Sequence, residues 1–259
     1  MTPDAKPAKT KMRRPSTVEP REDGFYRRYG KRIFDVAGAA AGLIVLFPVF
    51  LAVGAAVAIA SLGKAGRGPV FFSQRRVGKN RRPFALIKFR TMAPAPAGGE
   101  ASIAVTGDVR ITPLGALLRR WKIDEMPQLW NVCRGQMSLV GPRPELEEFV
   151  AGYTAEQRPV LRVRPGITDL ASIAYRHEAE LLAEHENPQE WYRQVVLPHK
   201  LALNLRYIQD ISFSGDVALI LKTLGVVFSG HSQRVRRSGR TRRCWPAGPS
   251  QSIIPGSAE

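Results

Sequence analysis

Cysteine is almost absent from this sequence, and its scarcity excludes two classes of protein. The 259 residues contain only Cys133 and Cys244, which lie far apart and lack the spacing of metal ligands. A disulfide-stapled fold is therefore not expected, and so low a count fits a reducing compartment. Neither cysteine has neighbours that would activate a nucleophile, so we interpret both as incidental.

Acidic residues are also scarce. Asp and Glu number 22 against 39 Lys and Arg, which gives a formal net charge of +17 and a pI near 10.6. This excess implies an anionic partner, which could be a nucleic acid, an anionic lipid or a phosphorylated substrate. A nucleic-acid partner is not expected, because no helix-turn-helix pattern or aromatic stacking platform is recognisable.

Charge of either sign is missing from one long segment. The 28 residues from Val36 to Gly63 carry no charge, and a bilayer core needs roughly 20 apolar residues as a helix. Pro48 interrupts the middle of this segment, where it removes a backbone hydrogen bond. The flanks on both sides are basic, and positive residues favour the cytoplasmic side of a membrane. One hypothesis is therefore a re-entrant helix, which enters the bilayer, bends at Pro48 and returns.

A single kinked span is the alternative, because proline is tolerated in membrane-spanning helices. A buried helix of a soluble protein is disfavoured by the length of the segment and by its basic flanks. From Lys64 to Gly99 there is no Asp or Glu, whereas nine Lys and Arg residues occur there. Cations next to a membrane attract anionic headgroups at roughly 1 kcal/mol each, so anionic lipid is an expected partner.

Within this basic stretch, residues 84–90 (FALIKFR) have the pattern of a strand. Lys88 and Arg90 would share one face, because side chains alternate along a strand. Two cations on one face suit a diphosphate, and a solvated strand face is the alternative. The Pro/Gly/Ala-rich residues 93–107 are expected to form a loop. A helix should then begin with Thr112 as its N-cap and Pro113 in its first turn.

Two adjacent carboxylates, Asp124 and Glu125, follow that helix. Pro127 is expected to begin a second short helix that ends near Gly135, so the acid pair could simply cap a helix N-terminus. The functional alternative is phosphate chemistry, since a carboxylate can attack phosphorus and a second acid can help to hold Mg²⁺. Arg143 stands between two prolines that fix its backbone, which suits bidentate phosphate binding.

Four segments, which lie in order between residues 31 and 228, resemble those of bacterial sugar transferases of the monotopic phosphoglycosyl transferase type. The segments are KRIFDVAGAAAGLIVLFPVF, GPVFFSQRRVGKNRRPFALIKFRTM, DVRITPLGALLRRWKIDEMPQLWNVCRGQMSLVGPRPE and RVRPGITDLASI. Each segment is moderately specific, and four in order are very specific. Two departures stand out: Asp169 occupies a position where many relatives have glycine, and Phe47 precedes Pro48 where the family often has serine.

The resemblance implies a transferase that moves a sugar phosphate from a UDP-sugar to a polyprenyl (undecaprenyl) phosphate and releases UMP, at the start of cell-surface glycan assembly. Asp124 would be the nucleophile that forms a covalent phosphosugar intermediate. Glu125 would complete the Asp-Glu dyad, with Mg²⁺ as the cofactor bound there. The expected substrate-binding residues are Lys88, Arg90, Arg110, Arg119, Gln128, Asn131, Arg143 and Glu145.

The expected fold is α/β, mostly α with short strands: a single compact catalytic domain with an N-terminal re-entrant membrane helix and interfacial amphipathic helices. Its segments would be a disordered basic leader (1–30), the re-entrant helix (31–63), the catalytic domain (64–230) and a disordered basic tail (231–259). The expected location is the cytoplasmic face of the bacterial inner membrane, and a homodimer is compatible with the sequence. The alternative function is a non-catalytic membrane-surface adaptor, whereas a multi-span transferase would need several long apolar segments.

Two amphipathic helices are expected near the C-terminus, over residues 191–207 and 216–228. Their apolar faces would pack mainly in the core, although a membrane surface is the alternative environment. The residues in question are Leu201, Leu203, Leu205, Leu219, Leu221 and Leu224.

Overall fold

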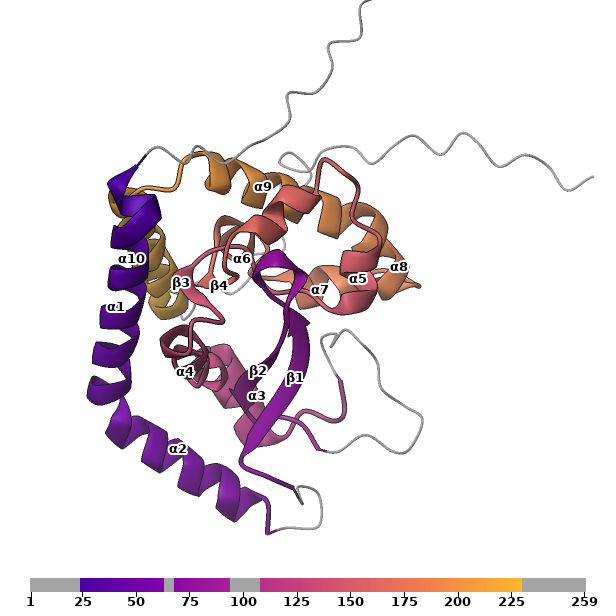
Figure 1. Ribbon diagram of the computed structural model, residues 1–259. Coiled ribbons are helices and arrows are strands. Elements are labelled where there is room, and N and C mark those ends of the chain that lie inside the picture. The colour runs from indigo at the N-terminus through magenta and orange to yellow at the C-terminus, as the bar shows by residue number, and fades with distance from the viewer. Residues whose placement is uncertain (1–23, 63–67, 94–107, 230–259) are drawn as a thin grey trace, which may run out of the picture.

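The computed structural model describes residues 24–62, 68–93 and 108–229, which fold mainly as helices with a few short strands (Figure 1). The leader up to residue 23, almost all of the predicted 93–107 loop, the basic tail and Cys244 lie outside the described residues. The expected fold class, one mostly helical domain with short strands, is confirmed.

A bent pair of helices forms the N-terminal arm of the molecule (Figure 1). A short π-helical turn, η1 (Tyr26–Gly30), continues into α1 (Lys31–Val45), and α2 (Phe47–Ala60) follows. Among the described residues no single helix is long and apolar enough to cross a membrane. The two helices together, bent by 62°, meet that requirement by length and composition only. The prediction that the disordered leader extends to residue 30 is therefore wrong for residues 26–30, because these residues are helical.

The break between the two helices lies at Leu46, two residues before the proline that was expected to mark it. Leu46 has φ −89° and ψ 2°, outside the helical range, and Pro48 occupies the first turn of α2. Proline fits there because a first-turn N–H has no partner within its own helix. Pro48 therefore lies just after the bend and begins the second helix.

A β-hairpin crosses the centre of the molecule (Figure 1). Its strands β1 (Phe71–Val77) and β2 (Pro83–Phe89) are antiparallel. The strand predicted over residues 84–90 is confirmed with a shift of one residue. Two very short strands, β3 (Ser138–Val140) and β4 (Gly166–Thr168), pair in parallel beside it.

The remaining elements are helices, and one of them confirms the predicted N-cap at Thr112. The Thr112 hydroxyl accepts a 3.0 Å hydrogen bond from the Gly115 N–H at the start of α3 (Pro113–Arg120). The others are η2 (Lys79–Arg81), η3 (Ile123–Glu125), α4 (Gln128–Cys133), α5 (Glu147–Ala151), η4 (Arg158–Arg162), α6 (Leu170–Ala174), α7 (Glu178–Ala183), α8 (Pro188–Trp191), η5 (Tyr192–Val196), α9 (Leu197–Gln209) and α10 (Phe213–Ser229).

The two predicted C-terminal helices exist, but the first is divided and the second is only partly buried. A π-helical turn, η5, separates α8 from α9. Leu201 and Leu219 belong to the largest hydrophobic cluster, as expected. Leu221 and Leu224 on α10 are instead 62% and 47% exposed. The core therefore takes only part of the apolar face of α10.

Candidate active site

The acid pair lies in η3, a single 3₁₀ turn between α3 and α4. Lys122 enters this turn in the left-handed conformation, with φ 57°. The side chains of Asp124 and Glu125 are both buried, with 6% and 7% of each residue exposed. Neither carboxylate caps α4, whose N-cap is Pro127 and has no side-chain hydrogen bond. The capping interpretation of the acid pair is therefore wrong for the helix that follows it.

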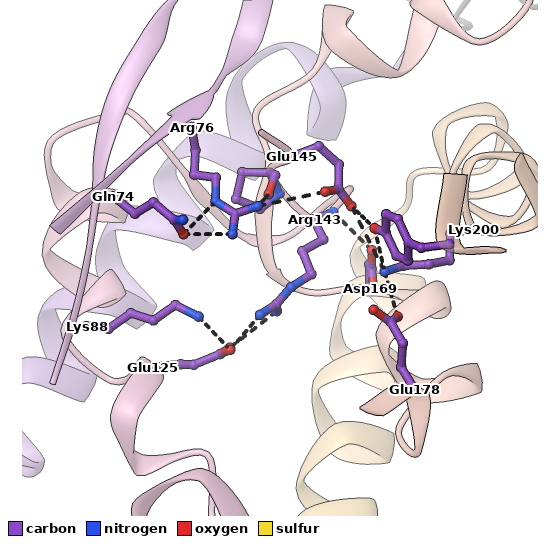
Figure 2. Close-up of polar contacts among 11 residues, drawn as sticks. Gln74, Arg76, Lys88, Glu125, Arg143, Glu145, Asp169, Glu178 and Lys200 are labelled. Atoms are coloured by element: carbon purple, nitrogen blue, oxygen red, sulfur yellow. Dashed lines mark hydrogen bonds and ion pairs between the residues drawn. The ribbon is translucent and has the colours of Figure 1, made fainter. Parts of the chain in front are cut away.

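Two cations hold Glu125 (Figure 2). Arg143 Nη2 lies 2.6 Å and Lys88 Nζ 3.2 Å from Glu125 Oε1. Burial opposes ionisation of Glu125, but Arg143 and Lys88 outweigh it and hold the pKa of this carboxyl well below its usual value. Glu125 in turn raises the pKa of the Arg143 guanidinium. Glu125 is therefore a fixed anion at ordinary pH.

Asp124 lies beside this ion-paired group but has the opposite environment. Its Oδ1 atom is buried and has no hydrogen-bond partner among the described residues. Burial and the negative charge of Glu125 raise the pKa of Asp124, while Lys88, Lys122 and Arg119 partly counter the rise. An unpaired buried oxygen costs free energy. Asp124 therefore has an available oxygen, which Glu125 lacks.

The backbone of Arg143 is fixed from two sides. Its N–H donates to Asp169 Oδ2 at 3.0 Å, and Asp169 Oδ1 also caps α6 by accepting from the Ser172 N–H. Next to it, the Val77 N–H donates to the Glu145 carbonyl at 3.0 Å. Gly166 allows the strands to approach, since a Cβ there would lie 2.1 Å from the Gly141 nitrogen. Asp169 thus positions the backbone of Arg143.

Two of the other predicted residues, Asn131 and Arg90, form hydrogen bonds to neighbouring elements of the fold. Asn131 is fully buried; its Nδ2 donates to the Ala85 carbonyl at 2.8 Å, and its Oδ1 accepts from the Ile87 N–H at 3.2 Å. It therefore ties α4 to β2, and its predicted contact with substrate stays a prediction. Arg90 Nη2 donates to Ser61 Oγ at 2.6 Å and to the Gly68 carbonyl, whereas Lys88 Nζ pairs with Glu125. Lys88 and Arg90 thus have different partners, and their binding of one phosphate stays a prediction.

The remaining predicted residues, Arg119, Arg110 and Gln128, differ in their partners. Arg119 acts electrostatically on Asp124 and donates from Nε to Thr91 Oγ1 at 2.8 Å. Arg110 forms an ion pair with Asp108, with Nη2 and Oδ2 2.6 Å apart. Gln128 is buried, and its Nε2 has no partner among the described residues. The substrate-binding roles of these residues stay predictions.

Glu145 lies in a second polar cluster, which the sequence did not reveal. The Tyr192 hydroxyl donates to Glu145 Oε1 at 2.7 Å, and Lys200 Nζ lies 4.0 Å from the same oxygen. Lys200 Nζ also donates to Glu178 Oε2 at 2.8 Å (Figure 2). Only folding brings Tyr192 and Lys200 to this position, and neither carries a signal in the sequence. Arg76 could have been found from strand alternation, because it lies on the same hairpin face as Lys88.

Most of the chain matches a known family. Residues 26–230 match the bacterial sugar transferase family. The chain belongs to this family. It is similar to the exopolysaccharide production protein ExoY of Rhizobium meliloti (strain 1021), with 32% identity over 226 residues that cover 80% of this chain and 91% of ExoY.

Two further relatives have names that state a reaction. The UDP-glucose:undecaprenyl-phosphate glucose-1-phosphate transferase of Caulobacter vibrioides (strain ATCC 19089 / CIP 103742 / CB 15) is 35% identical over 198 residues, 75% of this chain and 68% of the relative. The UDP-N-acetylgalactosamine-undecaprenyl-phosphate N-acetylgalactosaminephosphotransferase of Aeromonas hydrophila is 33% identical over 209 residues, 79% of this chain and 45% of the relative.

The acid pair of this sugar transferase fits the ligand needs of Mg²⁺. Mg²⁺ in proteins typically takes one or two carboxylates together with substrate phosphates, and Asp124 Oδ1 is an unpaired buried oxygen next to Glu125. The described residues contain no group of three or more His, Cys, Asp or Glu that could hold a metal ion. Any Mg²⁺ at this pair would therefore need substrate oxygens to complete its shell.

A small cavity of the sugar transferase is lined by residues of both polar clusters, among them Arg143, Glu145 and Lys200. It has about 20 Å³ of space for a water-sized group and is lined mainly by apolar side chains, with Lys200 and Asn204 among its polar ones. Asn204 Oδ1 is buried there without a partner in the described part of the chain. The space suits about one water molecule and is far too small for a sugar.

Proposed function

We propose that this sugar transferase moves a sugar phosphate from a UDP-sugar to undecaprenyl phosphate and releases UMP. The observation that carries the proposal is the contrast within the dyad: Asp124 Oδ1 is buried and unpaired, whereas Glu125 is fixed by Lys88 and Arg143. The relatives support it, because several are named as transferases from UDP-sugars to undecaprenyl phosphate. The relatives named for exopolysaccharide production suggest the same pathway class for this chain.

In the first step, the Asp124 carboxylate attacks the phosphorus that carries the sugar. The new Asp–O–P bond forms as the bond between that phosphorus and the bridging oxygen breaks, and UMP leaves with the electron pair. Lys88 and Arg143 would stabilise charge on the phosphoryl oxygens, since both lie within 3.2 Å of Glu125 Oε1 at the same pair. The product is an aspartyl-phosphosugar.

In the second step, a phosphate oxygen of undecaprenyl phosphate attacks the same phosphorus. The Asp–O–P bond breaks, the carboxylate is regenerated, and undecaprenyl-diphospho-sugar is released. Mg²⁺, held by Asp124, Glu125 and the substrate phosphates, would supply neutralisation of charge on the transferred group. Covalent transfer through one residue divides a reaction between two anions into two easier displacements.

The proposed location is the cytoplasmic face of the bacterial inner membrane, with the bent helix pair inserted as a re-entrant hairpin. The 62° bend, the uncharged segment and the basic residues on both sides support this topology. The exposed Leu221 and Leu224 of α10 would add an apolar surface beside this arm. Accessibility tags at residues 25 and 240 should both report the cytoplasm. Tags on opposite sides would mean that the helix pair crosses the membrane as a single span.

The reaction is tested with the purified protein in detergent, Mg²⁺, undecaprenyl phosphate and a panel of UDP-sugars. We expect UMP release with one or a few donors. Incubation with the same donor in the absence of acceptor should add the mass of one sugar phosphate to the peptide that contains Asp124. No UMP release with any donor would contradict the proposed function and favour a membrane-surface adaptor.

A further inference from the structure

Arg76 shares a face of the β1–β2 hairpin with Lys88. In the strand register Arg76 lies opposite Phe84 and Phe72 lies opposite Lys88, so Lys88 is on the face of the even-numbered β1 residues. In Figure 2 the charged ends of Arg76, Lys88 and Arg143 gather on one side of Glu125. Arg143 acts electrostatically on both Arg76 and Lys88.

The guanidinium of Arg76 is held in one orientation. Gln74 Oε1 accepts from Nε at 3.1 Å and from Nη2 at 2.8 Å, and the Pro144 carbonyl accepts from Nη1 at 3.1 Å. Glu145 Oε2 lies 3.8 Å from Nη1, and 17% of the side chain is exposed. A guanidinium has five N–H donors, so two donors of Arg76 make no hydrogen bond to a described residue.

Arg76 is a partly buried cation that lies close enough to Arg143 to be repelled by it. Burial lowers the pKa of Arg76, Glu145 opposes that change, and the charge of Arg143 lowers the pKa further. A structural role would not need three partly buried cations, whose side chains are 17%, 20% and 29% exposed, because apolar side chains fill such positions at no electrostatic cost. A polyanionic ligand among the three would relieve the repulsion.

We propose that Arg76 is a direct ligand of the donor diphosphate, together with Lys88 and Arg143. Gln74 and the Pro144 carbonyl orient its guanidinium, and the two remaining N–H donors bind phosphoryl oxygens. Arg is suited to this task because its planar fork matches a phosphate group. The inference rests on the proposed function, since it concerns the nucleoside diphosphate-sugar that the dyad would cleave.

Arg75 provides a matched control one residue away. It projects from the opposite face of β1, its side chain is 69% exposed, and its Nη2 lies 3.5 Å from the exposed Glu147. With the donor that supports UMP release, Arg76→Gln should lower kcat/KM by about 10- to 100-fold, and Arg75→Gln should leave it within about twofold. Arg76→Lys keeps the positive charge but lacks the planar guanidinium, so it should recover part of the lost kcat/KM.

Direct binding is separated from a positioning effect by calorimetric titration of UDP into the same variants. We expect Arg76→Gln to weaken UDP binding by about tenfold and Arg76→Lys to weaken it less, with far-UV circular dichroism unchanged. Wild-type UDP affinity and wild-type turnover in Arg76→Gln would overturn the inference while the proposed function stands. If wild type released no UMP with any donor, the proposed function would fail, and the UDP titration alone would decide whether Arg76 binds a diphosphate.

Discussion

Two buried carboxylate clusters in this molecule differ in one respect: whether every oxygen has a partner. Asp216, at the start of α10, is fully buried and accepts from the Tyr26 hydroxyl at 2.6 Å, from Lys31 Nζ at 2.7 Å and from the Tyr207 hydroxyl at 2.7 Å. Asp124 is buried to nearly the same degree, yet its Oδ1 has no partner among the described residues.

The cluster at Asp216 is a structural joint, whereas Asp124 belongs to the proposed reaction centre. The cluster at Asp216 ties η1 and α1 to α9 and α10, and Asp35 adds to this joint by accepting from the Leu139 N–H at 3.0 Å. A satisfied buried network stabilises one arrangement of the chain. A buried carboxylate oxygen without a partner costs free energy, which the rest of the fold must offset. Such unsatisfied groups are typical of ligand-binding and catalytic sites.

The largest expected effect is on transfer at Asp124. Asp124→Asn removes the nucleophile with little change in shape, so UMP release should fall about 10³-fold or more. The free energy of unfolding should stay the same or rise, because the folded state disfavours the charge that is removed. UMP release and chemical denaturation in the same detergent measure the two effects. Near-normal turnover in Asp124→Asn would contradict the covalent mechanism.

The converse is expected at Asp216. Asp216→Ala leaves Lys31 and two tyrosine hydroxyls without their carboxylate, which should lower the free energy of unfolding by about 3 kcal/mol. Glu147→Gln is the matched control, since it breaks a pair whose side chains are 69% and 62% exposed and should change stability by less than about 0.5 kcal/mol. Equal effects of the two changes in urea denaturation would mean that the joint is not stabilising.

A smaller effect is expected at Asp169, which belongs to the site but has both oxygens bonded. Asp169→Ala removes the N-cap of α6 and the acceptor of the Arg143 N–H, so it should cost about 1 kcal/mol of stability. Arg143 would also be less well fixed, and kcat/KM for the donor should fall by about tenfold. Loss of stability with unchanged kcat/KM would show that Asp169 supports α6 and not Arg143.

The smallest effect is a change in a titration midpoint. Because the pKa of Asp124 is raised in the folded state, its ionisation lowers stability as pH rises from the unfolded pKa through the folded one. Glu125 has the opposite sign: its pKa is lowered, so its contribution is present above the unfolded pKa and is lost as pH falls through the folded one.

These signs are measured by carboxyl ¹³C NMR in Mg²⁺-free buffer. Asp124 should titrate above the usual range for aspartate, and Glu125→Gln should lower the midpoint of Asp124, because it removes the neighbouring negative charge. An unchanged midpoint in Glu125→Gln would leave burial as the whole cause of the shift.

By itself the sequence determined the features that depend on a few neighbouring residues. The Thr112 cap, the β2 strand, the bend near Pro48 and the acid pair were all predicted, because caps, alternation and proline act over one or two turns. The four ordered segments also predicted the family. Local patterns could place these elements but could not pair them.

Only the tertiary structure decided which side chains meet. The Tyr26–Asp216 bond joins residues 190 positions apart, and Arg143 reaches Glu125 across 18. Asn131 was predicted at the substrate because its polarity is visible in the sequence, whereas its burial against β2 is not. The partners of a polar side chain depend on how distant elements pack and exclude water. That packing left Asp124 Oδ1 buried without a partner among the described residues, whereas both oxygens of Glu125 are bonded to Arg143.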